Sequence, residues 1–269
     1  MPASAAPDSA PALMAFDLDG TILFADGIST ADAAAIARWQ AAGNLAVCAT
    51  GKSISAARYA LQDTPVRFDY YVLNTGCVIT DAALEPIWTQ PLDAAVVRAL
   101  DAHFTGAAGV NVYATTLSSR DVILHEGVAT KETTILIDAV GFDPAMLETH
   151  QFVGVPIWIP NDPDLLNTTR DWICAHLPQA GVVQNQDFLD VIPAGSDKGA
   201  GLARLTELLG KSPRTFSIGD SFNDVGMHRW AGRSACFSYS PAEVKAACDV
   251  VVGSAAEFIA AALDDAPAG

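Results

Sequence analysis

The chain has 269 residues, of which 51% are hydrophobic, so it can bury one core of ordinary domain size together with a sizeable insertion. Its formal net charge of −16 argues against nucleic acid or an anionic membrane surface as a partner. No apolar run approaches the ~18 residues that a membrane span requires. Five cysteines without a CxxC pair indicate neither a disulfide framework nor a zinc site, and they are typical of a cytoplasmic protein.

The first part of the chain alternates between strand and helix patterns. The expected elements, in chain order, are strand 13–17, helix 30–42, strand 45–49, helix 53–62 and strand 70–73. Residues 45–49 form a continuous apolar run, which is typical of a parallel strand buried on both faces. Alternation of this kind predicts a parallel sheet with right-handed crossovers and helices on both faces.

The pattern changes near residue 90. The next expected elements are helix 92–104, strands at 110–114, 122–125, 133–139 and 156–159, helix 163–176, and strands at 182–183 and 188–192. Thr133, Ile135 and Ile137 occupy every second position of one segment, which favours antiparallel strands with one face on helices. These segments predict a separate α+β module.

The first pattern then resumes. Its expected elements are helix 198–209, strand 215–218, helix 224–231, strand 235–237, helix 242–247, strand 250–252 and helix 255–263. We therefore expect an α/β protein whose Rossmann-like, parallel-sheet core consists of residues 12–90 and 188–263, with an α+β cap at 91–187. Residues 1–11 and 264–269, which lack an apolar pattern, are expected to be flexible tails.

A pair of carboxylates follows the first expected strand, in the motif Asp17-Leu18-Asp19-Gly20-Thr21. If the strand geometry continued, Asp17 and Asp19 would point to the same face. Two like charges so close are costly unless a cation or a proton lies between them. The motif therefore indicates a functional site rather than a structural turn.

Polar motifs also follow three other strands of the expected parallel sheet. These motifs are Thr50-Gly51-Lys52, Asn74-Thr75-Gly76 and the segment 219–224, which contains Asp220, Asn223 and Asp224. Ligands of open parallel sheets bind beyond the carboxyl ends of the strands. We therefore expect all four motifs to converge on one rim, although Asp220 and Asp224 could also be explained by a turn and a helix cap.

The residue types in these motifs indicate phosphate chemistry. Carboxylates without histidine or cysteine favour Mg²⁺. Thr50, followed by a glycine, could bind a phosphoryl oxygen, although it could also cap the next helix, and Lys198 at the start of an expected helix could add a positive charge. One carboxylate can attack phosphorus, while a second can protonate the leaving oxygen and then activate water.

With these motifs in this order, over about residues 12–263, the chain resembles the haloacid dehalogenase (HAD) superfamily of Mg²⁺-dependent phosphohydrolases. It is most similar to the Cof-type members, which carry a large α/β cap. The resemblance implies that Asp17 is the nucleophile and a metal ligand, and that Asp220 is a second ligand. It also implies that Asp19 is the general acid and base, with its backbone carbonyl completing the metal shell.

The same resemblance assigns the other residues. Thr50, Gly51 and Lys198 are expected to contact the substrate phosphate, and Asn223 and Asp224 to support the site. The function implied is Mg²⁺-dependent hydrolysis of a small phosphomonoester, such as a sugar phosphate or a related metabolite, through an aspartyl-phosphate. A phosphomutase on the same fold, and a non-hydrolytic phospho-receiver or binding protein, remain open as alternatives.

Two positions depart from the family pattern and bear on substrate contacts. Lys52 stands where many relatives have arginine, and Thr75-Gly76-Cys77 stands where many have Asn-Gly-Ala, with Asn74 just before. Lys52 and Asn74 are therefore only candidate substrate contacts. Polar residues near expected loop ends of the cap could meet substrate or be solvated surface; they are Arg120, His125, Lys131, Asn161 and Asp162. The sequence indicates neither the substrate nor the oligomeric state.

Overall fold

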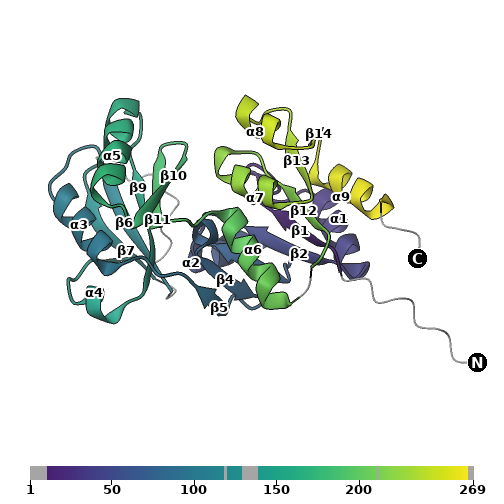
Figure 1. The fold of residues 1–269 in the computed structure, drawn as a ribbon, viewed down its shortest axis with the longest axis horizontal. Helices are drawn as coiled ribbons and strands as arrows, with labels where there is room; N and C mark the ends of the chain where they lie inside the picture. The colour runs from purple at the N-terminus through teal and green to yellow at the C-terminus, as the bar shows by residue number, and fades with distance from the viewer. Residues whose placement is uncertain (1–10, 118–119, 129–138, 211, 266–269) are drawn as a thin grey trace, which may run out of the picture.

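The computed structural model describes residues 11–117, 120–128, 139–210 and 212–265, which form two units side by side (Figure 1). The first unit contains an eight-stranded sheet. In spatial order its strands are β14 (Val250–Val252), β13 (Arg233–Phe237), β12 (Thr215–Ile218), β1 (Leu13–Phe16), β2 (Leu45–Ala49), β3 (Tyr70–Leu73), β4 (Val78–Asp81) and β5 (Pro86–Thr89). The pairs from β14 through to β3 are all parallel, which confirms the expected α/β class.

The strands β4 and β5 form an antiparallel hairpin at the edge of this sheet, and the sequence analysis did not predict it. Val78 and Ile79 are adjacent buried residues, so the segment shows no alternation from which a half-buried strand could be recognised. The hairpin follows a single 3₁₀ turn, η1 (Asn74–Gly76), directly after β3.

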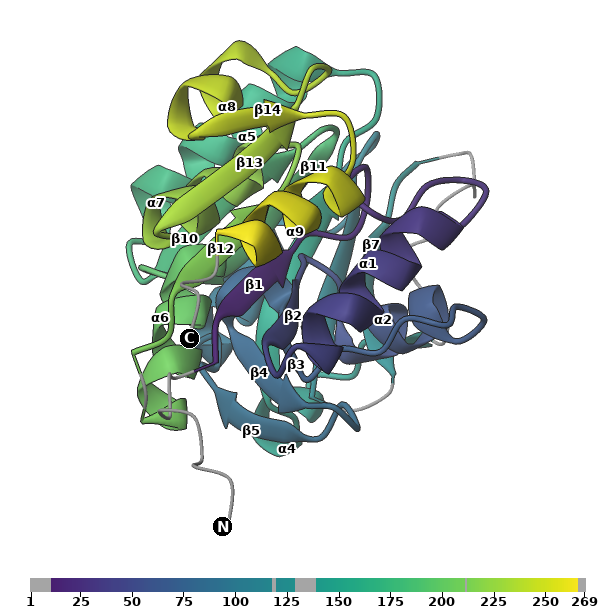
Figure 2. The same ribbon diagram turned by 90° about the vertical axis from the view of Figure 1, so that its right-hand side faces the viewer.

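Helices cover both faces of the eight-stranded sheet (Figure 2). On one face, Met14 and Phe16 belong to the same buried cluster as residues of α1 (Thr30–Ala41), α2 (Ile54–Leu61) and α9 (Ala255–Asp264). On the other face, Leu13 and Ala15 pack with residues of α6 (Lys198–Leu209) and α7 (Val225–Trp230). The helix α8 (Ala242–Ala247) contacts α7 and β13. The continuous apolar character of β1 follows from this burial on both faces.

The second unit contains a six-stranded sheet, with helices packed on one face. In spatial order its strands are β10 (Ala180–Asn185), β11 (Phe188–Pro193), β9 (Phe152–Trp158), β6 (Asn111–Thr116), β7 (Asp121–Glu126) and β8 (Ala139–Gly141). All pairs are antiparallel except β7 with β8. Its helices are α3 (Ala94–Phe104), α4 (Met146–Thr149) and α5 (Pro163–His176).

One expected boundary differs from the structure. Residues from 188 onward were assigned to the core, but β11 pairs with β9 and β10 of the second sheet. Leu189 and Val191 are buried in the core of the second unit, because alternate residues of β11 face its helices. The chain therefore returns to the first unit between Pro193 and Lys198.

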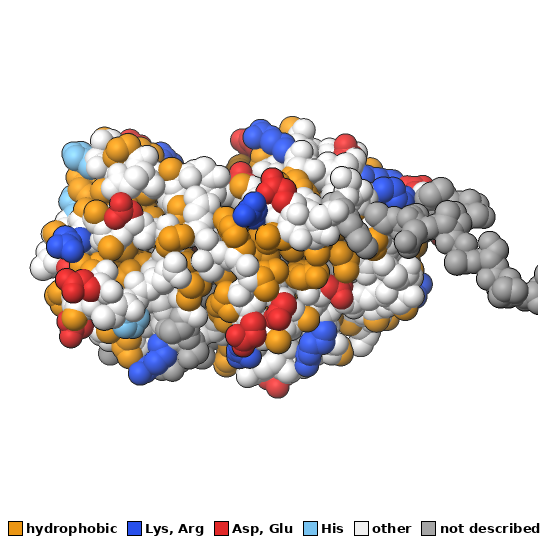
Figure 3. All heavy atoms as spheres, turned by 60° about the horizontal axis from the view of Figure 1, so that its bottom comes forward, with side chains coloured by type: hydrophobic (Ala, Val, Ile, Leu, Met, Phe, Trp, Pro, Cys, Tyr) orange, Lys and Arg blue, Asp and Glu red, His pale blue; other side chains and the backbone are white. Residues whose placement is uncertain are grey.

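The remaining expected elements occur within a few residues of their expected bounds. The strand expected at 133–139 lies outside the described residues except for Ala139, which begins β8. The expected tails also lie outside them, apart from Pro11, Asp264 and Asp265, and Asp264 ends α9. None of the described helices combines the length and apolar character of a membrane-spanning segment. On the face shown in Figure 3, charged side chains lie in small groups around a band of apolar ones.

Candidate active site

The four polar motifs meet where β1, β2, β3 and β12 end, beneath the sheet of the second unit. A cavity of about 480 Å³ lies there. Its lining includes Asp17, Asp19, Thr50, Gly51, Lys52, Asp220 and Asn223 from the first unit, and Thr115, Asp121, Pro156, Phe188 and Asp190 from the second. The site therefore has a floor from one unit and a roof from the other.

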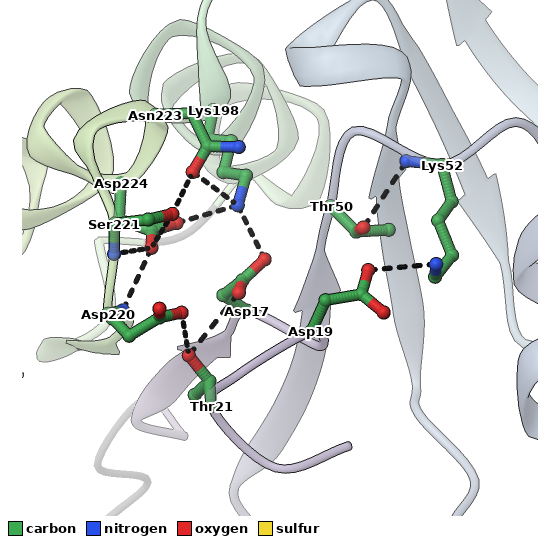
Figure 4. A network of polar contacts seen from close by, with 10 residues as sticks. All are labelled: Asp17, Asp19, Thr21, Thr50, Lys52, Lys198, Asp220, Ser221, Asn223 and Asp224. Carbon is green, nitrogen blue, oxygen red and sulfur yellow. Dashed lines mark hydrogen bonds and ion pairs between the residues drawn. The ribbon is translucent and has the colours of Figure 1, made fainter. Parts of the chain in front are cut away.

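Lys198 is a buried cation between two carboxylates (Figure 4). Its Nζ lies 2.6 Å from Asp17 Oδ1 and 2.6 Å from Asp224 Oδ1, and it also donates to Asn223 Oδ1 at 3.4 Å. Burial alone would lower the pKa of Lys198, but the charges of Asp17 and Asp224 outweigh burial and raise it. Lys198 is therefore held in its charged form. It is the first residue of α6, and its side chain points toward Asp17 at the end of β1.

Asp17 carries the strongest electrostatic perturbation of the motif residues. Burial, followed by the charge of Asp224, raises the pKa of Asp17 to about 8, although Lys198 acts in the opposite direction. One oxygen each of Asp17, Asp220 and Asp224 lie within 4.8 Å of one another. A single lysine leaves this cluster with excess negative charge.

Asp220 is brought close to Asp17 by the turn after β1. Thr21 Oγ1 lies 3.0 Å from Asp220 Oδ1 and 3.3 Å from Asp17 Oδ2. Gly20 has φ +78°, and a Cβ added there would lie 2.9 Å from Asp220 Oδ2. The glycine is therefore needed both for the turn and for the close approach of the carboxylate.

Asp224 organises the loop after β12. Its Oδ2 accepts hydrogen bonds from the backbone N–H groups of Asp220 and Ser221, both at 3.0 Å, while its Oδ1 accepts from Lys198. Asn223 Oδ1 accepts from the Ser221 hydroxyl at 2.9 Å. Both oxygens of Asp224 are thus used to position the loop and the lysine.

Asp19 lies apart from Asp17, contrary to the crowding that the i, i+2 spacing predicted. The strand β1 ends at Phe16, so strand alternation does not extend to these residues. In Figure 4 Asp17 points toward Lys198, whereas Asp19 points toward Lys52. The Lys52 Nζ lies 2.8 Å from Asp19 Oδ2, so each carboxylate has its own cation.

Thr50 and Gly51 form a tight connection between β2 and α2. The Thr50 hydroxyl accepts the backbone N–H of Lys52 at 3.2 Å, and the Thr50 N–H donates to Val72 at 2.9 Å. Both Thr50 and Gly51 line the cavity, beside Asp17 and Asp19. Ser53 caps α2, so the cap that Thr50 could have provided comes from Ser53 instead.

Asn74 takes a different position from the one proposed for a substrate contact. Its Nδ2 donates to Thr115 Oγ1 of the second unit at 3.0 Å, and its backbone has φ 49°. It does not line the main cavity, but it lines a small adjoining one together with Asp190. Asn74 therefore joins the two units behind the main cavity.

The cap candidates taken from the sequence lie elsewhere. The His125 ring contacts the carbonyl of Ala107 at 2.6 Å, and Asp162 caps α5 through the N–H of Leu165. Neither these two residues nor Arg120 and Asn161 are among the described residues that line the cavity, and Lys131 lies outside the described residues.

The cap residues that do line the cavity were missed by the sequence analysis. Asn185 and Gln186 lie at the connection between β10 and β11. The others come from one face of the second sheet: Thr115, Asp121, Pro156, Phe188 and Asp190. A signal was present in β11, where Asp190 interrupts an apolar strand between the buried Leu189 and Val191. Which cap strand faces the core could not be read from the sequence, because it depends on how the two units pack.

The donor set at the floor fits a hard divalent cation. The clustered side chains are all carboxylates, and oxygen-only sites are typical of Mg²⁺. Burial, followed by the charge of Asp224, raises the pKa of Asp17 and of Asp220, so keeping both carboxylates ionised is costly without more positive charge nearby. A cation among these oxygens would supply it.

The carboxylates lie at the carboxyl edge of a parallel sheet, and the second unit covers them. This is the arrangement of an α/β protein whose ligand site lies where the order of the strands reverses. A family model for haloacid dehalogenase-like hydrolases matches residues 14–262, and the chain belongs to this family.

Two curated relatives match most of the chain. It is 27% identical over 241 residues to the HMP-PP phosphatase of Cronobacter sakazakii, with 82% of each chain covered. It is 23% identical over 258 residues to the 5-amino-6-(5-phospho-D-ribitylamino)uracil phosphatase YwtE of Bacillus subtilis, covering 86% of this chain and 89% of that one.

A partial match and a solved structure complete the comparison. The chloroplastic endoribonuclease YBEY of Arabidopsis thaliana is 38% identical over 82 residues, but this match spans only 30% of this chain and 14% of that protein. A solved HAD subclass IIB sugar phosphatase has the same fold, with a TM-score of 0.77 and 20% identity, covering 94% of this chain and 98% of that one. The resemblance to the haloacid dehalogenase family is confirmed: the chain is an HAD-like hydrolase, and the two curated relatives that match most of it are phosphatases.

Proposed function

We propose that the chain hydrolyses a small phosphomonoester, such as a sugar phosphate or a related metabolite, in two steps through an aspartyl-phosphate. The observation that carries the proposal is the position of Asp17: it lies at the cavity floor, paired with Lys198 and close to Asp220. A carboxylate fixed in this way, beside a cation, can act as a nucleophile toward a bound phosphoryl group.

In the first step Asp17 attacks phosphorus, the bond to the leaving oxygen breaks, and Asp19 delivers a proton to the departing alkoxide. In the second step Asp19 takes a proton from water, which attacks phosphorus and releases Asp17 and free phosphate. The ion pair with Lys52 holds the Asp19 carboxylate in position for both steps. Asp19 is exposed to the cavity, so it can exchange protons with the leaving group and with water.

The transferring group gathers negative charge that the chain must stabilise. Lys198 lies beside the attacking carboxylate, and Thr50 with the backbone N–H of Gly51 can hold phosphoryl oxygens. Asp17, Asp220 and the backbone carbonyl of Asp19 would hold Mg²⁺, which when bound supplies positive charge to the phosphoryl oxygens. Closure of the roof over the site would exclude bulk water and select the leaving group.

The proposal is tested by measuring phosphate release from a panel of phosphomonoesters, including p-nitrophenyl phosphate, with Mg²⁺ and with a chelator. Phosphate release that requires Mg²⁺ and is lost in Asp17→Asn supports it. Asp26→Asn is the matched control, because Asp26 is an exposed carboxylate outside the cavity lining. Equal activity in Asp17→Asn would contradict the mechanism.

The same panel separates the alternatives. An isomeric monophosphate without free phosphate would indicate a phosphomutase. Stable phosphorylation of Asp17 without turnover of any ester would indicate a phospho-receiver.

A further inference from the structure

The roof of the cavity is the face of the second sheet that its own helices leave uncovered. Alternate residues of β11 divide between the two faces: Leu189 and Val191 are buried against the helices, while Phe188 and Asp190 line the cavity. Asp190 pairs with Pro156 of β9, which also lines the cavity. The regular pleat of the sheet thus places Asp190 above the floor.

Asp190 is a carboxylate without a protein partner. Its side chain makes no hydrogen bond or ion pair within the part of the chain that the structure describes, yet it lines both the main cavity and the adjoining one. Its Oδ2 lies 3.6 Å from the position that a Cβ on Gly51 would take. Asp190 therefore lies beside Thr50 and Gly51, which hold the phosphate in the proposed function. The leaving group is bonded to that phosphate, so its first atoms must lie near Asp190.

Asp121 brings a second carboxylate to the roof. It is 2% exposed, and its Oδ2 accepts hydrogen bonds from the hydroxyls of Ser53 at 3.0 Å and Ser55 at 3.2 Å. Its Oδ1 has no hydrogen-bond partner among the described residues. The two serines belong to the start of α2, so Asp121 also ties the roof to the floor.

The charges around the cavity do not balance. Lys52 is the one basic side chain among its described lining residues, and it is paired with Asp19. Burial raises the pKa of Asp190 to about 7, although the charge of Lys198 acts in the opposite direction, and it raises the pKa of Asp121 to about 6 despite the hydrogen bonds from Ser53 and Ser55. A substrate with a second anionic group would add repulsion, whereas a cationic leaving group would relieve it.

We infer that Asp190 is a specificity-determining residue that receives an ammonium group on the leaving group, so that the substrate is the phosphomonoester of an amino sugar or amino alcohol. This inference rests on the proposed function and narrows its substrate class. Asp121 contributes to the same preference from β7, and together the two carboxylates reject esters that carry a second anion.

The test compares three esters with the phosphate on the same carbon of a six-carbon skeleton: glucosamine 6-phosphate, glucose 6-phosphate and 6-phosphogluconate. For the unmodified protein we expect kcat/KM to be highest with the ammonium and lowest with the carboxylate, with at least about a tenfold spread. In Asp190→Asn we expect the ratio of the first to the last to fall by about tenfold, chiefly through KM for the amino sugar.

Asp187→Asn is the matched control, because this exposed carboxylate lies three residues before Asp190 and does not line the cavity; it should leave the ratio unchanged. If Asp190→Asn fails to fold, Asp121→Asn measured on the same ratio replaces it. The inference is overturned if kcat/KM is higher for 6-phosphogluconate than for glucosamine 6-phosphate, or if neither variant changes the ratio of these two values. In either case, turnover of p-nitrophenyl phosphate would still uphold the proposed function. Failure to hydrolyse any ester, p-nitrophenyl phosphate included, overturns both.

Discussion

Lys198 Nζ lies 2.6 Å from Asp17 Oδ1, joining two residues that are 181 positions apart in the chain. Asp17 follows the first strand, and Lys198 begins the helix to which the chain returns after the insertion. This buried pair, with Asp224, therefore holds the two halves of the catalytic unit together at the site itself. It makes the stability of the protein and its proposed chemistry depend on the same contacts.

Lys198→Met should destabilise the protein strongly, because it leaves Asp17 and Asp224 buried without their cation. Removing one partner of a buried charge network costs about 3–5 kcal/mol. We expect a large fall in the melting temperature together with loss of phosphatase activity. Adding Asp224→Asn to Lys198→Met should restore part of the lost stability, since one uncompensated charge is removed. An unchanged melting temperature in Lys198→Met would contradict this account.

Gly76→Ala should displace the start of α6 and with it Lys198. Gly76 has φ +100°, and an added Cβ would overlap the backbone carbonyl of Asp197. We expect a loss of about 3 kcal/mol or more of unfolding free energy, measured by urea denaturation. Gly43→Ala is the control: Gly43 has φ +82° with nothing within 4 Å of its Cβ position, so only backbone strain of about 1 kcal/mol is expected. Equal losses would show that the contact with Asp197 is unimportant.

The fold of the catalytic unit could be predicted because local patterns determine it. Apolar runs such as 45–49, and the alternation of strand and helix patterns along the chain, mark the elements without reference to distant residues. The assignment of β11 to the wrong unit shows the limit of such reasoning. Whether a strand pairs in one sheet or another depends on partners distant in sequence, and its alternation is compatible with both.

The site was predictable to the same extent. Convergence of Asp17, Thr50 and Asp220 follows from the rule that the carboxyl ends of parallel strands share an edge. Lys198 begins a helix instead, so only the family resemblance led us to expect it at the site. The opposite directions of Asp17 and Asp19, and the roof residues Asp121 and Asp190, could not be inferred in this way. The directions of Asp17 and Asp19 depend on where β1 ends, and the position of the roof residues depends on how the two units pack. Neither can be predicted from a short sequence motif.

Lys52→Met should change activity more than stability. Its ion pair with Asp19 is partly exposed, with the side chains 25% and 59% accessible, and such pairs contribute at most about 1 kcal/mol. We expect kcat/KM to fall by about tenfold, because Asp19 loses the contact that positions it. Lys52→Arg, which keeps the charge, should retain most of the activity. A fall in melting temperature without a change in kcat/KM would assign Lys52 a structural role instead.

Asp190→Asn should alter the pH dependence of stability. Burial raises the pKa of Asp190 from its ordinary value of about 4 to about 7, so the folded protein binds this proton more tightly than the unfolded chain does. Its contribution to stability is therefore lost as the pH rises from about 4 through 7. Asparagine does not ionise, so the variant does not lose this contribution at high pH. We therefore expect the melting temperature of Asp190→Asn minus that of the unmodified protein to be larger at pH 8.5 than at pH 5, by about 2 °C or more.

The control for this pH effect is again Asp187→Asn, whose exposed side chain should give the same difference at both pH values. A relative melting temperature of Asp190→Asn that does not vary with pH would mean that Asp190 is better solvated than its position suggests.

The central claim is that Asp17 becomes phosphorylated during turnover. Asp19→Asn should still accept a phosphoryl group from p-nitrophenyl phosphate, whose good leaving group needs little acid assistance, but it should hydrolyse the acyl phosphate slowly. The most direct measurement is the intact-protein mass after acid quench of Asp19→Asn with p-nitrophenyl phosphate and Mg²⁺. We expect the mass of one added phosphoryl group in Asp19→Asn, and none in the variant that also carries Asp17→Asn. Release of nitrophenol without phosphorylated protein, or a phosphoryl group that persists when Asp17 is replaced, would contradict the mechanism.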